Sequence, residues 1–221
     1  MDNKRLKEIY TAASQLFIMQ GYSKTQISHI AKAIGVSVGT IYLDFTGKKE
    51  IAHFVLKCTI FPEFMDKQFD RPITDNLFIG LEEEIKQKYD DLLNKLSSHL
   101  AIEIKDYTFE QLISESFDLV SRYAIWILFI EKNQYDFDTL ASDYKDYRKR
   151  FFEVMMQYIT AYMEGGYIRK TKYPQYTVHH VIETLAHWAM DIYYNSFEIM
   201  DIPHELAKEV VMDNLIPVYK N

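Results

Sequence analysis

Glycine and proline are unusually scarce in this chain. Its 221 residues include seven glycines and five prolines, which is roughly 5% of the chain against an average of about 12%. Because tight turns depend on these two residues, a chain with so few of them forms few tight turns. A many-stranded β fold is therefore disfavoured, and the composition predicts an all-α protein that is long enough to bury a sizeable core.

The glycines and the charges are unevenly distributed along the chain. Four of the seven glycines lie within the first 50 residues, and all five prolines lie after residue 60. The segment 1–57 carries eight basic and four acidic side chains, a balance of +4, and the remainder carries −11. The overall charge of −7 argues against a general polyanion binder, but the two regimes predict a small basic module followed by a larger acidic body. We place the domains at 1–50 and 51–221, with the boundary inside a continuous helix.

Three helices are predicted in the first 50 residues. Apolar residues at helical spacing stop at Gly21, which ends the first helix. Thr25 is placed to cap a second, short helix, and Gly35 ends it. Ser37 is placed to cap a third helix over about 38–44. Two short helices joined by a tight turn are typical of a helix-turn-helix motif.

The third predicted helix suits a DNA major groove. It is short, and its outer face is small or polar, which permits close approach to base edges. Tyr42 and Lys48 are placed to reach phosphates, and Thr25 offers a hydroxyl to the same strand. The alternative is that Thr25 and Ser37 only cap helices, that Tyr42 packs, and that Lys48 is a solvated charge. The candidate DNA-binding residues are Thr25, Ser37, Val38, Gly39, Thr40, Tyr42 and Lys48.

A dense pattern of residues covers about the first 55 positions. Its members are Ile9-Tyr10-Thr11-Ala12-Ala13, Leu16-Phe17, Gly21-Tyr22, Thr25, Ile27, Ile30-Ala31, Gly35-Val36-Ser37, Gly39-Thr40-Ile41-Tyr42, Phe45, Lys48 and Glu50. This pattern resembles the DNA-binding domain of the TetR family of transcriptional regulators. The resemblance implies that Tyr42 and Lys48 contact the DNA backbone and that Thr25 contacts a phosphate. It also implies that residues 38–40 lie nearest the bases.

One position departs from that pattern. Many members of the family carry a basic or aromatic residue where this chain has Asp44. Because phosphate repels a carboxylate, we expect Asp44 to face away from DNA or to pair with Lys48 or Lys49; accepting a hydrogen bond from a cytosine amine is the remaining alternative. The recognition helix contains no Arg or Gln, so we expect modest specificity per half-site, with dimerisation and DNA shape supplying the rest.

The acidic body is predicted to be a helical bundle. A connecting helix from Lys48 is ended or kinked by Pro62 or Pro72. The further helices predicted are 75–101, 109–132 with Thr108 as its cap, a helix from Asp138 or Ser142 to Gly165-Gly166, 174–195 and 203–218. The resemblance implies that this body binds a small effector and forms a homodimer through its last two helices.

Several aromatic and polar side chains of the body are candidates for an effector pocket. They are Tyr123, Trp126, Tyr158, His187 and Asp191, with Trp188 beside them. A pocket of aromatic residues with a few polar anchors is typical of small-molecule sites. The alternative is that the aromatic residues belong to the core and that His187 and Asp191, one helical turn apart, form a satisfied pair.

Enzymatic chemistry has no support in the sequence. The pairs His180-x-x-Glu183 and Glu183-x-x-x-His187 lack the second copy that a di-iron bundle needs. We expect Cys58 to be a buried small hydrophobe, and the chain has no P-loop, dinucleotide-binding motif or nucleophile elbow. We therefore expect neither a metal nor another cofactor.

The sequence also bears on location. We expect no signal peptide, because no apolar segment follows the first five residues, and the longest apolar run, 124–130, is far shorter than the roughly 18 residues of a membrane span. A single cysteine fits a reducing cytosol, so we expect a cytoplasmic protein without a membrane partner.

These observations predict a DNA-binding transcriptional regulator. We expect a ligand-responsive repressor that binds a near-palindromic operator as a homodimer. The alternative is a helical small-molecule-binding or metal-dependent protein whose helix-turn-helix is not used on DNA.

Overall fold

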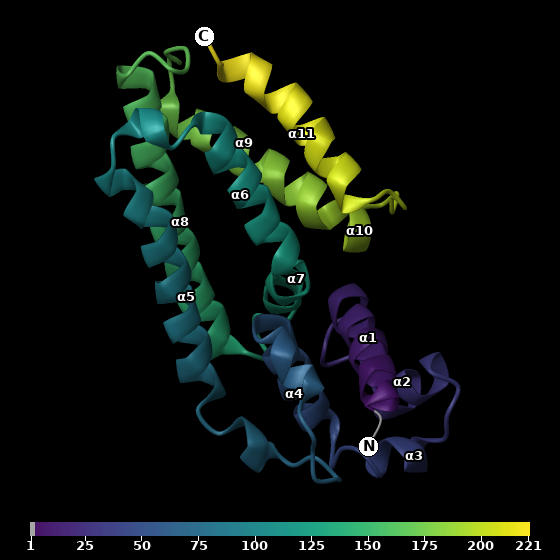
Figure 1. Ribbon diagram of the computed structural model, residues 1–221. Helices are drawn as coiled ribbons and strands as arrows, with labels where there is room; N and C mark the ends of the chain where they lie inside the picture. Colours follow the sequence, from purple (N-terminus) through teal and green to yellow (C-terminus); the bar gives the residue numbers. More distant parts are fainter. Residues whose placement is uncertain (1–2) are drawn as a thin grey trace. The chain divides into compact units, whose positions relative to one another are not determined.

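The computed structural model describes residues 3–221, and every regular element in that range is helical (Figure 1). The all-α prediction is therefore confirmed. The helices are α1 (Lys4–Met19), α2 (Ile27–Ala33), α3 (Val38–Tyr42), α4 (Lys48–Ile60), α5 (Leu81–Ser98), α6 (Phe109–Arg122), α7 (Ala124–Lys132), α8 (Asp138–Glu164), α9 (Pro174–Ala186), α10 (Ile192–Tyr194) and α11 (His204–Tyr219). Short 3-10 turns occupy Pro62–Asp66, Asp75–Phe78, His99–Ala101 and Ile104–Asp106, and a π-helical turn, His187–Asp191, joins α9 to α10.

The chain forms two compact units. The first contains the residues up to Gln87 together with Ile125–Ser142, and the second contains Lys88–Ala124 together with Asp143–Asn221. The domain boundary that we placed after residue 50 lies inside α4 and within the first unit. The units divide the chain differently from that proposal because α4, the segment after it and α7 share one core with the three amino-terminal helices.

The corner between α1 and α2 is held in the first unit by a single buried amide. Asn133 is 1% exposed; its Oδ1 accepts a hydrogen bond from the Tyr22 N–H at 2.5 Å, and its Nδ2 donates to the carbonyls of Phe17 at 3.2 Å and Phe129 at 2.7 Å. The rings of Phe17 and Phe129 meet edge to face, with centroids 5.6 Å apart. Gly21 adopts φ +91° at this corner, a conformation that favours glycine.

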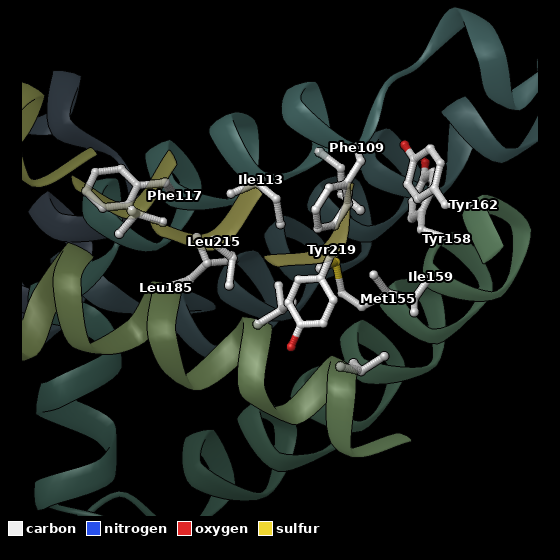
Figure 2. Close-up of a cluster of buried hydrophobic side chains, with 14 of the residues drawn as sticks. Phe109, Ile113, Phe117, Met155, Tyr158, Ile159, Tyr162, Leu185, Leu215 and Tyr219 are labelled. Carbon is white, nitrogen blue, oxygen red and sulfur yellow. The ribbon is translucent and has the colours of Figure 1, made fainter. Parts of the chain in front are cut away.

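The core of the second unit lies between α6, α8, α9 and α11 (Figure 2). Tyrosines on α8 point into it and keep their hydroxyls bonded: Tyr158 donates to the Leu96 carbonyl at 2.5 Å and Tyr162 to the Tyr107 carbonyl at 2.6 Å. Satisfied hydroxyls let these large rings be buried without a desolvation penalty. The aromatic stripe on α8 therefore belongs to the core.

Two predicted caps are confirmed and one is wrong. The Ser37 hydroxyl accepts from the Thr40 N–H, and Thr108 forms a capping box with Gln111. Thr25 does not cap α2, because Gln26 occupies the cap position in a capping box with His29.

The predicted helix 109–132 is two helices that separate at Tyr123. The sequence contains no helix breaker there. Its two halves bury their apolar side chains in different compact units, and this tertiary preference overrides the continuous helical pattern. Two other predicted helices differ locally: α5 starts at Leu81, after a 3-10 turn, and 174–195 is interrupted by the π-helical turn. Within residues 3–221, the structure has no helix with the length and apolarity that crossing a bilayer requires.

We predict that Asn133→Ala lowers the free energy of unfolding by about 2–3 kcal/mol, because it leaves the Tyr22 N–H without its acceptor and removes the donor to the Phe17 carbonyl. Urea denaturation followed by circular dichroism measures this loss. Asn94→Ala, at an exposed position of α5, is the matched control and should change stability by less than about 0.5 kcal/mol. Equal effects of the two substitutions would contradict the role assigned to Asn133.

Candidate nucleic-acid interface and ligand pocket

The recognition helix α3 is anchored from one side and exposed on the other. Ile41 is fully buried, whereas Val38 is 38% and Tyr42 49% exposed. The Ser37 hydroxyl fixes the start of the helix, 3.2 Å from the Thr40 nitrogen and 2.9 Å from the Thr40 hydroxyl. The outer face is thus small or polar, as the sequence predicted, and is available to a partner.

Gly39 lies in the middle of this exposed face. A Cβ added there would meet only the Ser37 Oγ at 3.7 Å, which is ordinary van der Waals contact. Glycine inside a helix costs about 1 kcal/mol relative to alanine, and nothing in the packing requires it here. The missing side chain is therefore consistent with the close approach of an external surface, as a groove of DNA would need.

Lys48 and Tyr22 form a contact beside the α1–α2 corner. The Lys48 ammonium donates to the Tyr22 carbonyl at 2.8 Å and lies 4.0 Å from the centre of the Tyr22 ring. Burial lowers the pKa of Lys48. Since an ammonium has three donors, two remain for another acceptor. Lys48 therefore combines a structural contact with a capacity to bind phosphate.

Thr25 is fully buried. Its hydroxyl donates to the Gly21 carbonyl at 2.8 Å and accepts from the Gln20 Nε2 at 3.1 Å. The hydroxyl thus stabilises the turn, and the exposed polar side chains at the start of α2 are Gln26, Ser28 and His29. The sequence analysis did not single out these residues, because it assigned the cap one position too early.

Asp44 is buried and makes two ion pairs. Its Oδ1 lies 2.8 Å from Arg5 Nη2 and 2.7 Å from Arg71 Nη1, and Arg5 Nε bonds to its Oδ2. The predicted pairing with Lys48 or Lys49 is wrong, because Lys49 bonds to a different carboxylate, Asp75. The expectation that the Asp44 carboxylate faces away from DNA agrees with its burial.

The second unit contains a pocket of about 420 Å³. It is lined by Leu92, Lys95, Leu96, His99, Glu115, Ser116, Asp118, Leu119, Arg122 and Tyr123. The Ser116 hydroxyl is buried and has no hydrogen-bond partner in the part of the chain that the structure describes. An unsatisfied buried hydroxyl on a pocket wall is a ready contact for a polar atom of a ligand.

The pocket lining carries charges of both signs, the carboxylates Glu115 and Asp118 and the cations Lys95 and Arg122. Asp118 pairs with Lys208, 2.6 Å away, and Glu115 accepts from the Tyr107 hydroxyl at 3.2 Å. The structure shows no carboxylate between residues 3 and 221 paired with Lys95 or Arg122. A ligand with an apolar body and an acidic group would meet both the leucines and the unpaired cations.

The five predicted effector residues lie in different surroundings. Tyr123 lines the pocket, and Tyr158 is committed to the core. On the π-helical turn, His187 is exposed and Asp191 is half-buried. Burial raises the pKa of the Asp191 carboxyl, and a hydrogen bond with the Asn195 side chain partly opposes this rise. Trp126 is buried in the first unit.

Sequence reasoning missed Lys95, Ser116 and Arg122, because in a helical pattern they look like ordinary polar positions. Within the described residues 3–221, no group of three or more metal-ligating side chains is close enough to hold a metal ion.

Comparisons with known proteins show similarities to regulatory proteins. Residues 9–54 match the family model described as bacterial regulatory proteins, tetR family. The fatty acid metabolism regulator protein of Bacillus subtilis (strain 168) is 37% identical over 90 residues, which make up 40% of this chain and 39% of that relative. The chain therefore matches about two fifths of the length of this curated relative.

A solved structure of similar fold is among the matches. The ketosteroid transcriptional regulator KstR2 of Mycobacterium tuberculosis matches with a TM-score of 0.57 at 15% sequence identity, over 100% of this chain and 97% of that one. At this identity the likeness shows the fold alone.

We predict that Gly39→Ala raises the free energy of unfolding, by up to about 1 kcal/mol, because alanine stabilises a helix and its methyl group fits. Gly35→Ala is the matched control: Gly35 has φ +72°, so the same change there should destabilise the protein. Thermal denaturation of both variants measures these shifts. A loss of stability in Gly39→Ala would show that packing, not an external partner, requires the glycine.

Proposed function

By its amino-terminal domain this chain belongs to the bacterial TetR family of regulatory proteins, and on that premise we propose that it is a ligand-responsive repressor binding a near-palindromic operator as a homodimer. The observation that carries this proposal is the recognition helix, with a buried anchor at Ile41 and a glycine without a packing role at its exposed face. Each α3 would enter a major groove, with the two half-sites about 34–36 Å apart.

We infer dimerisation through α9 and α11. Both helices expose apolar side chains: Tyr176 on α9 is 65% exposed, and Leu206 and Val218 on α11 are each 45% exposed. Exposed apolar residues on adjacent elements are typical of protein interfaces. The negative charge of the body would also keep it from DNA, so that only the basic module approaches the operator.

We infer that the effector is an amphipathic acid bound in the pocket of the second unit. The leucines would contact its apolar body, Arg122 and Lys95 its acidic group, and Ser116 a polar atom. The similarity to a regulator of fatty acid metabolism supports a fatty acid or its coenzyme A thioester. Release from DNA then requires that the effector bind the free state more tightly than the DNA-bound state.

Selection of operators from random DNA, followed by fluorescence anisotropy over a salt series, tests the regulator proposal. We predict that Lys48→Met reduces binding to operator and random duplex alike and lowers the salt slope by about one phosphate contact. Lys145→Met, an exposed position on α8, should leave both unchanged. If the protein selects no sequence even at low salt, the regulator proposal fails and the alternative of an unused helix-turn-helix is favoured.

We predict that Arg122→Met weakens binding of palmitate and palmitoyl-coenzyme A by at least about tenfold, which is about 1.4 kcal/mol, because the acidic group loses its cation. Isothermal titration calorimetry measures this affinity, with Lys145→Met again as the control. Ser116→Ala should weaken binding of the same two ligands without lowering the stability of the protein, because the wild-type hydroxyl is already unpaired. Unchanged affinity in both pocket variants would place the effector elsewhere.

A further inference from the structure

The segment that joins α4 to α5, residues 61–80, returns to the end of the recognition helix; we refer to it as the strap. The Ile73 N–H donates to the Asp44 carbonyl at 2.7 Å, and the Thr46 N–H donates to the Ile73 carbonyl at 3.1 Å. Phe45 and Ile73 thereby form a parallel bridge, and both side chains are buried. The strap is thus hydrogen-bonded to the residues immediately after α3.

Ion pairs also connect the residues after α3 to α1 and to the strap. Asp44 lies two residues beyond α3, Arg5 comes from α1, and Arg71 comes from the strap. The Asn3 side chain adds hydrogen bonds from the start of α1 to the strap carbonyls of Met65 and Lys67, each at 2.8 Å. Three segments that are distant in the sequence therefore meet at one carboxylate.

This arrangement is strong enough to fix a backbone position. Asp44 is fully buried, and it accepts both Nε and Nη2 of Arg5, so that the contact is bidentate. Charge-assisted, bidentate pairs are among the most directional hydrogen bonds, and removing one partner of a buried pair leaves an uncompensated charge. The recognition helix is only five residues long, so its own backbone hydrogen bonds hold its direction weakly.

We propose that Arg71, which lies outside the helix-turn-helix segment, is a positioning residue for operator recognition. Its pair with Asp44 holds the end of α3, and thus the direction of the small exposed face at 37–40, in the arrangement that reads bases. Arg71 does not itself bind DNA in this proposal. The inference rests on the proposed function for its link to the operator, but the positioning itself is a property of the free protein.

The test uses Arg71→Met in the full chain, with Lys67→Met as the matched control. Lys67 is an exposed cation of the same strap whose ammonium lies 5.3 Å from the Phe64 ring. In the free protein, hydrogen exchange of the amides of 43–46 should accelerate at least about tenfold in Arg71→Met and stay unchanged in Lys67→Met. On DNA, Arg71→Met should lose at least about tenfold in operator affinity, about 1.4 kcal/mol, and keep both its affinity for random duplex and its salt slope.

Three outcomes overturn the proposal. Unchanged exchange at 43–46 shows that Arg71 does not hold α3. Equal losses on operator and random duplex, with the salt slope reduced by about one, make Arg71 a phosphate contact. Accelerated exchange with unchanged operator affinity shows that the pair is structural only.

Two further measurements keep the test decisive. If Arg71→Met does not fold, Arg71→Lys retains the charge and loses the planar guanidinium; it should show smaller changes in the same two measurements. If the wild-type protein selects no operator, the proposed regulator function fails, and the exchange experiment still decides whether Arg71 positions α3.

Discussion

The three hydrogen bonds of the Asn133 amide are the contact on which the first unit depends. Two of them, to the Tyr22 N–H and the Phe17 carbonyl, join the turn after α7 to the point where α1 passes into α2, and the third returns to Phe129 of α7. A residue more than a hundred positions away therefore completes the helix-turn-helix. Lys48 bonds the Tyr22 carbonyl at the same corner. The first fifty residues therefore owe their geometry partly to side chains that no local pattern contains.

The net charge of the first unit does not show how many of its basic side chains are already paired with carboxylates. The segment 1–57 has an excess of bases, yet four of its cations form ion pairs within the chain: Lys4 with Glu8, Arg5 with Asp44, Lys49 with Asp75, and Lys57 with Glu84. Arg71 is committed to the same buried carboxylate as Arg5. The cations that remain exposed are fewer than the sequence suggests, so binding to DNA would depend more on the fit of α3 than on electrostatic attraction alone.

The sequence was most informative where one local signal decides the structure. Ser37 and Thr108 were predicted as caps because a hydroxyl next to an apolar helical pattern has one obvious use, and both predictions are confirmed. The partners of Asp44 were predicted incorrectly because Arg71 lies 27 positions away, beyond any helical repeat. The break at Tyr123 was missed for the same reason, since only the division of the apolar residues between two units requires it.

The pocket shows why functional side chains are harder to find than core ones. Aromatic residues such as Tyr158 stand out in the sequence as pocket candidates, but Tyr158 packs in the core. Ser116 and Arg122 are inconspicuous, and they are candidates for ligand contacts because one is buried without a partner and the other is a cation without an ion pair. A core residue satisfies its contacts within the chain, whereas a residue that serves a ligand leaves a contact open. That difference is visible only when the partners of every polar atom are known.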